Sequence, residues 1–109
     1  MVFDREFLTG TVGVLILSLL AEREMYGYEI LKEAERRSAS AFQLKEGTLY
    51  PALHRLEQQG WITAEWKETD LGRSAKFYSL TREGKRQLER ELESWHRLSS
   101  AVGLLLKRA

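Results

Sequence analysis

The side chains best suited to contact another molecule stand in one segment, where His54, Arg55 and Gln58 follow one another at helical spacing. All three can hydrogen-bond to phosphates or to the edges of bases in the major groove of DNA. Gly47 and Thr48 keep the start of this segment slim, so its backbone amides have room to approach a phosphate. Recognition of a nucleic acid is the chemistry that these residues indicate.

Catalysis finds little support in the sequence. The absence of cysteine excludes disulfides, thiol nucleophiles and cysteine-based zinc or iron–sulfur sites. His54 and His96 stand far apart, and neither a glycine-rich phosphate loop nor a nucleophile with an evident base is present. We therefore expect no enzyme, no metal site and no cofactor.

Composition indicates one globular domain in a reducing compartment. The chain has 109 residues, 43% hydrophobic and 30% charged, and its lack of cysteine fits the cytoplasm. The apolar run at residues 12–21 is shorter than the roughly 20 residues of a membrane span. It follows Asp4 and Glu6 rather than a basic segment, so we expect neither a signal peptide nor a membrane helix.

Net charge is only +1, but its distribution is uneven. Between residues 73 and 86, five basic side chains stand against the single acidic Glu83. The basic residues are Arg73, Lys76, Arg82, Lys85 and Arg86. A local excess of this kind is typical of a surface that meets DNA, although many charge clusters are merely solvated.

Hydrophobic periodicity predicts the helices that position these residues. A first helix, with Leu8, Val12 and Leu15 in its stripe, is apolar most of the way round and should be buried from several sides, which suggests a partner subunit. A more polar helix is expected at residues 26–37, followed by a turn. A third should span about residues 46–59, because Pro51 is tolerated only near a helix start and Gly60 suits a C-terminal cap.

Two strand-like stretches follow, at residues 61–68 and 75–80, joined by a turn at residues 70–73. Thr81 is an expected N-cap for a long final helix that ends near Leu106. The predicted fold is therefore mainly α with a small β-hairpin, a winged helix-turn-helix of order α-α-α-β-β-α. In that motif the third helix enters the major groove and the hairpin contacts the adjacent backbone or minor groove.

The predicted third helix has two faces. Its core stripe comprises Leu49, Ala52, Leu53 and Leu56. The expected DNA contacts on the helix and hairpin are Thr48, Tyr50, His54, Arg55, Gln58, Arg73 and Lys76. Some of these have plainer interpretations: Tyr50 as an aromatic at the edge of the core, His54 as a surface residue without a role, and the hairpin cations as solubilising charges.

These residues also form a known pattern. GTLYPALHRLEQQGWI at residues 47–62, AEW at 64–66 and GRSAKFYSLTREGK at 72–85 closely resemble the PadR family of bacterial transcriptional regulators, and YGYEI at 26–30 matches its second helix. The resemblance implies a winged-helix repressor that is homodimeric through its terminal helices. It further implies a palindromic operator and release by a small molecule. The DNA contacts that it implies are Thr48, Tyr50, His54, Arg55, Arg73 and Lys76. The single C-terminal helix resembles the compact branch of the family.

Dimerisation is expected from the terminal helices, with residues 1–81 as the winged-helix domain and residues 82–109 as a dimerisation helix. The expected interface residues are Leu8, Val12, Leu15, Leu88, Leu92, Trp95, Val102 and Leu106. The alternative is that the last helix covers only its own protomer.

Similarity to multidrug-responsive family members implies that Trp95 stacks a flat aromatic or hydrophobic effector, the alternative being plain packing. A winged helix that binds protein instead of DNA is the competing function.

Overall fold

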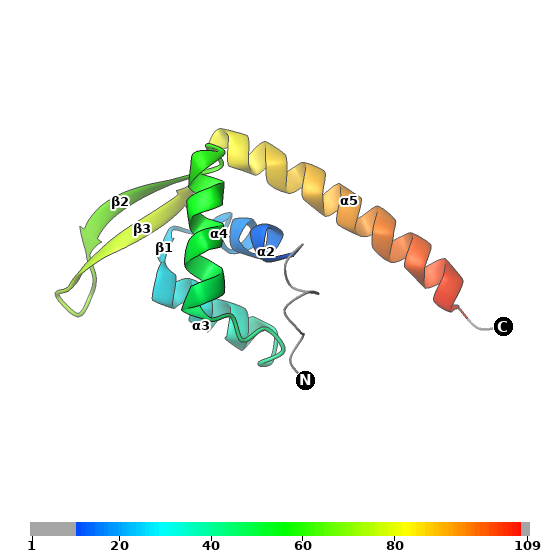
Figure 1. The fold of residues 1–109 in the computed structure, drawn as a ribbon, viewed down its shortest axis with the longest axis horizontal. Helices are drawn as coiled ribbons and strands as arrows, with labels where there is room; N and C mark the ends of the chain where they lie inside the picture. Colours follow the sequence, from blue (N-terminus) through cyan, green and yellow to red (C-terminus); the bar gives the residue numbers. More distant parts are fainter. Residues whose placement is uncertain (1–10, 108–109) are drawn as a thin grey trace.

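Residues 11–107 of the computed structural model are described, and they form four helices and one antiparallel sheet. The helices are α2 (Val12–Leu20), α3 (Gly27–Arg37), α4 (Glu46–Gln58) and α5 (Arg82–Leu106). The strands are β1 (Met25–Tyr26), β2 (Ile62–Glu68) and β3 (Ser74–Leu80). The hairpin of β2 and β3 extends from one side of the helical body and α5 from the other (Figure 1). The predicted winged-helix order is confirmed, and none of the helices described is long and apolar enough to cross a membrane.

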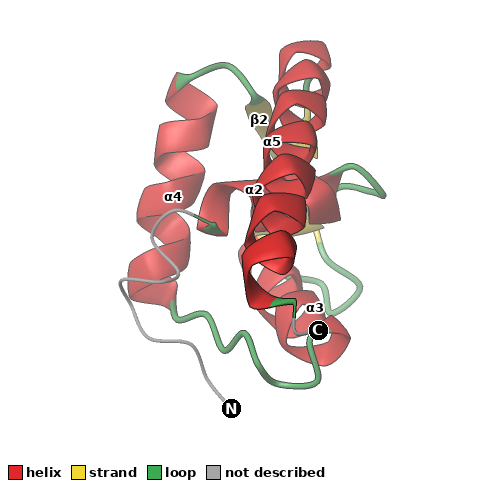
Figure 2. Ribbon diagram, turned by 90° about the vertical axis from the view of Figure 1, so that its right-hand side faces the viewer, coloured by secondary structure: helices red, strands yellow, loops and turns green. Residues whose placement is uncertain are grey.

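Helix α2 lies at the centre of the core. Ile16 and Leu17 are fully buried, and α2 packs against α3, α4, α5 and β3. Figure 2 shows α2 between α4 and α5. The single protomer therefore supplies the burial that the apolar sequence of α2 demands, and the second subunit inferred for this helix is not needed for that purpose.

The sheet has three strands in the order β1-β3-β2. β1 pairs with β3, so that Met25 lies opposite Tyr78 and Tyr26 opposite Phe77. No sequence pattern predicts β1, because two residues cannot display an alternation of apolar and polar positions. The helix expected from residue 26 begins one residue later than its sequence pattern indicates. Tyr26 is the residue just before α3, and its backbone N–H donates to the Glu29 carboxylate at 3.1 Å.

The end of α4 fixes the direction of the hairpin. Gly60 adopts a left-handed φ of 77°, which glycine accepts without steric cost. The Trp61 N–H then donates to the Leu56 carbonyl at 3.1 Å, closing the predicted glycine cap. Because β2 begins at Ile62, directly after this cap, the helix and the hairpin hold a fixed relation to one another.

The start of α5 is attached to the same cap. Thr81 Oγ1 accepts a hydrogen bond from the Gly84 N–H at 3.0 Å, as predicted for an N-cap, and donates to the Gly60 carbonyl at 2.7 Å. The Thr81 N–H donates to the Trp61 carbonyl at 3.0 Å. Leu88 still packs into the core, whereas from Leu92 to the end of α5 every residue is exposed.

Candidate nucleic-acid interface

Helix α4 presents an outer strip that is free to meet another molecule. Its inner strip, Leu49, Ala52, Leu53 and Leu56, is buried as predicted. At about 100° per residue, the opposite side of the helix carries Gly47, Pro51, His54 and Gln58, and all four are exposed. His54 and Gln58, one turn apart, are therefore the polar side chains of α4 that project furthest from the core.

One flank of α4 faces α3 and the hairpin. Tyr50 is 44% exposed, and its hydroxyl lies so close to Gly27 that a Cβ at Gly27 would be 2.3 Å from the hydroxyl oxygen. Tyr50 is thus an aromatic at the edge of the core that also keeps a surface open to solvent. Seven residues later on the same flank, Glu57 Oε1 lies 3.6 Å from Lys76 Nζ of β3.

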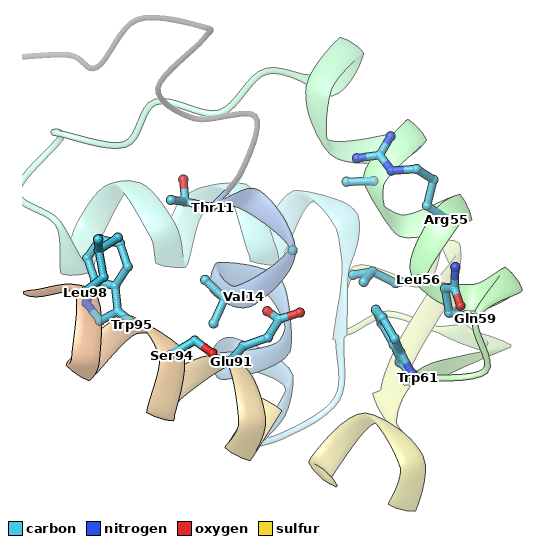
Figure 3. Close-up of a pocket in the computed structure, with 12 residues that line it drawn as sticks. Thr11, Val14, Arg55, Leu56, Gln59, Trp61, Glu91, Ser94, Trp95 and Leu98 are labelled. Carbon is cyan, nitrogen blue, oxygen red and sulfur yellow. The ribbon is translucent and has the colours of Figure 1, made fainter. Parts of the chain in front are cut away.

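The other flank of α4 faces a pocket. Arg55 and Gln59 line a cavity of about 580 Å³ between α2, α4 and α5. Figure 3 shows Arg55 at the α4 rim of this cavity, with Trp61 beside Leu56 and with Trp95 on the opposite wall. The structure therefore separates two predicted contacts that are adjacent in sequence: His54 projects outward, whereas Arg55 borders the pocket. Thr48, another predicted contact, is half-buried.

The hairpin tip is a tight turn with an exposed cation. The Thr69 N–H donates to the Arg73 carbonyl at 2.6 Å, and Gly72 adopts a φ of 77°. No ion pair involves the Arg73 side chain within the described part of the chain, so its charge is available to a phosphate. Lys76, predicted as its companion, instead points back toward α4, beside Glu57 and over the ring of Tyr78.

Trp66 is an exposed hairpin residue that the sequence did not single out as a DNA contact. Trp66 lies opposite Lys76 in the register of β2 and β3, and it is 67% exposed. The alternation of Ile62, Ala64 and Trp66 correctly predicts a shared face, but only the first of these is buried. The hairpin extends beyond the core, so the face that carries Ile62 and Trp66 is packed at its base and exposed to solvent towards its tip.

The opposite face of the hairpin is braced. Lys67 Nζ donates to both Glu24 carboxylate oxygens, at 2.6 and 2.8 Å, and Ser79 Oγ donates to the same carboxylate at 3.5 Å. The hydrogen bond that Lys67 donates to the Glu24 carboxylate raises the pKa of Lys67. These contacts join the hairpin to the segment just before β1 and so restrict how far the hairpin can swing.

The predicted interface residues fall into three groups. Val12 and Leu88 are buried in the protomer core and Leu15 is half-buried, so the first two offer little surface to a partner. Leu8 lies outside the described residues. The exposed apolar members are Leu92, Trp95, Val102 and Leu106.

Across residues 11–107, no cluster of three or more histidine or acidic side chains is arranged to hold a metal ion.

A helical body with an exposed polar strip on α4, beside a braced hairpin with a basic tip, defines a winged helix-turn-helix DNA-binding protein. The family model of PadR-like transcriptional regulators matches residues 16–90. The chain belongs to this family, whose members regulate transcription.

Individual relatives agree with this assignment. The crystal structure of a PadR-like transcriptional regulator from Bacillus cereus superimposes with a TM-score of 0.84 at 31% identity, covering 95% of this chain and 99% of that one. A transcriptional regulator of Mycobacterium tuberculosis is 33% identical over 90% of this chain and 88% of its own length. The negative transcriptional regulator PadR of Bacillus subtilis is 32% identical over 67% of this chain and 40% of its own length.

Proposed function

We propose that this chain is a ligand-responsive repressor that binds a palindromic DNA operator as a homodimer. The observation that carries the proposal is the exposed strip of α4, with His54 and Gln58 outermost, beside a hairpin whose tip bears the unpaired Arg73. The strip enters the major groove, where its side chains reach base edges, and Arg73 contacts the neighbouring phosphates. Thr48, Tyr50 and Arg55 approach from the sides of α4. Repression is supported by the negative regulator among the relatives.

Dimerisation is supported by the exposed apolar strip of α5. Leu92, Trp95 and Val102 project from a helix that has left the protomer core. A contiguous apolar patch of this kind marks an interaction surface. A two-fold partner would cover it and place two α4 helices in half-sites about one helical turn, roughly 34 Å, apart, which is why the operator should be palindromic. A footprint over the region upstream of the gene should show two symmetric half-sites with this spacing; an unsymmetric footprint would contradict the proposed operator.

Removing Arg73 is expected to weaken duplex binding and to reduce its salt dependence. One lost phosphate contact lowers the slope of log affinity against log salt by about 0.9. The measurement is fluorescence anisotropy of the footprinted duplex at several salt concentrations, for Arg73→Ala and the wild type. Arg90→Ala is the matched control, since Arg90 lies on α5 and is hydrogen-bonded to Gln87. An unchanged slope for Arg73→Ala would remove the hairpin tip from the interface.

Ligand response is supported by the pocket between α2, α4 and α5. Its volume of about 580 Å³ suits a drug-sized molecule, and Trp61 and Trp95 contribute aromatic walls on opposite sides. A flat aromatic ligand can stack on Trp95. Because Arg55 and Gln59 of α4 line the same pocket, a bound ligand would contact the recognition helix itself.

Trp95→Leu is expected to weaken binding of a planar aromatic probe such as acridine orange by about tenfold, the loss of a stacking contact and its buried area. The dissociation constant is measured by probe fluorescence without DNA. Trp66→Leu is the matched control, because Trp66 lies on the hairpin and does not line the pocket. Equal affinities for the two variants would exclude Trp95 from the effector site.

A further inference from the structure

An ion pair between Glu57 of α4 and Lys76 of β3 joins the two elements that are proposed to bind DNA; the surface around it is called the seam. Glu57 and Lys76 are 36% and 39% exposed, so both side chains remain in reach of solvent. Lys76 Nζ also lies 5.7 Å from the centre of the Tyr78 ring. Burial and, to a smaller extent, the negative charge of Glu57 raise the pKa of Tyr78.

This ion pair is not needed to hold the hairpin. β2 and β3 pair over seven residues, from Ile62 with Leu80 to Glu68 with Ser74, and the brace at Glu24 fixes their far face. An exposed ion pair contributes little to stability, and the separation of 3.6 Å between Lys76 Nζ and Glu57 Oε1 is long for a hydrogen-bonded pair. Its loss should therefore leave the fold unchanged.

The ion pair between Glu57 and Lys76 should affect DNA binding more than it affects the stability of the fold. Affinity for non-operator DNA comes mainly from cations that neutralise phosphates, independently of sequence. Lys76 is offset by Glu57 in the free protein, and a carboxylate beside the recognition helix repels the DNA backbone. The ring of Tyr78 lies beside Lys76, and its hydroxyl is uncharged near neutral pH because burial raises its pKa.

We propose that Glu57 weakens binding to non-operator DNA by holding the side chain of Lys76, a residue of β3, against the recognition helix α4. A loosely docked duplex leaves the pair intact. When α4 is seated in its operator, the hairpin is brought close enough for a phosphate to replace Glu57 as the partner of Lys76. Lys76 thereby strengthens operator binding selectively, and Glu57 is a determinant of specificity without contacting a base. This inference rests on the proposed DNA-binding function.

The test is Glu57→Gln, which keeps the size of the side chain and removes its charge. Affinity for a non-operator duplex should rise roughly three- to eightfold at 0.1 M salt, with a salt slope steeper by about 0.9, as one phosphate contact is gained. Operator affinity should rise by a smaller factor, so the ratio of the two affinities falls. Glu93→Gln is the matched control, because Glu93 pairs with Arg97 on α5, away from α4 and the hairpin.

A Lys76→Met background separates the two effects of Glu57. In that background, Glu57→Gln should raise the affinity for the non-operator duplex only slightly, because only one repulsive charge is removed. A three- to eightfold rise there would show that Lys76 is not the restrained group and would overturn the proposal. An unchanged or weaker non-operator affinity for Glu57→Gln, with an unchanged melting temperature, would also overturn it. If the wild-type protein bound no duplex at all, the proposed function itself would fall, and this inference with it.

Discussion

Gly84→Ala is expected to destabilise the protein by about 3 kcal/mol, a large value for one methyl group. A Cβ at position 84 would lie 1.9 Å from the Trp61 carbonyl oxygen and 2.8 Å from Leu80 Cδ1. The Trp61 carbonyl is backbone and also accepts the Thr81 N–H, so it has little freedom to move away. The melting temperature, followed by circular dichroism, should fall by on the order of 10–20 °C.

Gly47→Ala is the matched control for this experiment. A Cβ at Gly47 meets nothing within 4 Å, and alanine is the better residue inside a helix, so its melting temperature should stay level or rise. Equal melting temperatures for the two variants would show that α5 does not depend on this close approach. The contact matters for function because the C-terminal cap of α4, the base of the hairpin and the start of α5 all meet at Gly60, Trp61 and Gly84.

Sequence reasoning was most successful where the signal is local. The inner strip of α4 follows from its 3.6-residue period, and the caps at Gly60 and Thr81 follow from residue chemistry at a single position. The hairpin turn was likewise predictable, because Gly72 supplies the left-handed conformation. These elements place the outer strip of α4, so the exposed positions of His54 and Gln58 could be derived before the structure was known.

What the sequence did not reveal depends on contacts between distant residues. Lys76 is committed to Glu57, nineteen positions earlier, and its basic type alone favoured a free phosphate contact. Arg55 borders a pocket because residues of α2 and α5 enclose the space on this side of α4, which no local pattern predicts. Val12 and Leu88 are buried within the protomer, which the sequence could not show because an apolar stripe does not say whether its partner belongs to the same chain.

The exposed apolar residues of α5 are where a second substitution should have a large effect, on dimerisation. Val102→Glu is expected to convert a dimer into a monomer at micromolar concentration, because the new carboxylate would be buried in an apolar interface without a partner. Sedimentation measures the change. Operator affinity should then fall by at least about 100-fold, since the two recognition helices are no longer linked and lose the high effective concentration of the second half-site.

Ser100→Glu is the control that isolates this face of α5. It adds the same charge two residues earlier, about 200° around the helix from Val102, where Ser100 lies near His96 and Arg97 on the side of α5 opposite Val102. This variant should remain dimeric and bind the operator like the wild type. A dimeric Val102→Glu variant would show that the exposed apolar strip of α5 does not form the dimer interface. A monomeric variant with undiminished operator affinity would instead show that one winged helix is sufficient, and that the operator need not be palindromic.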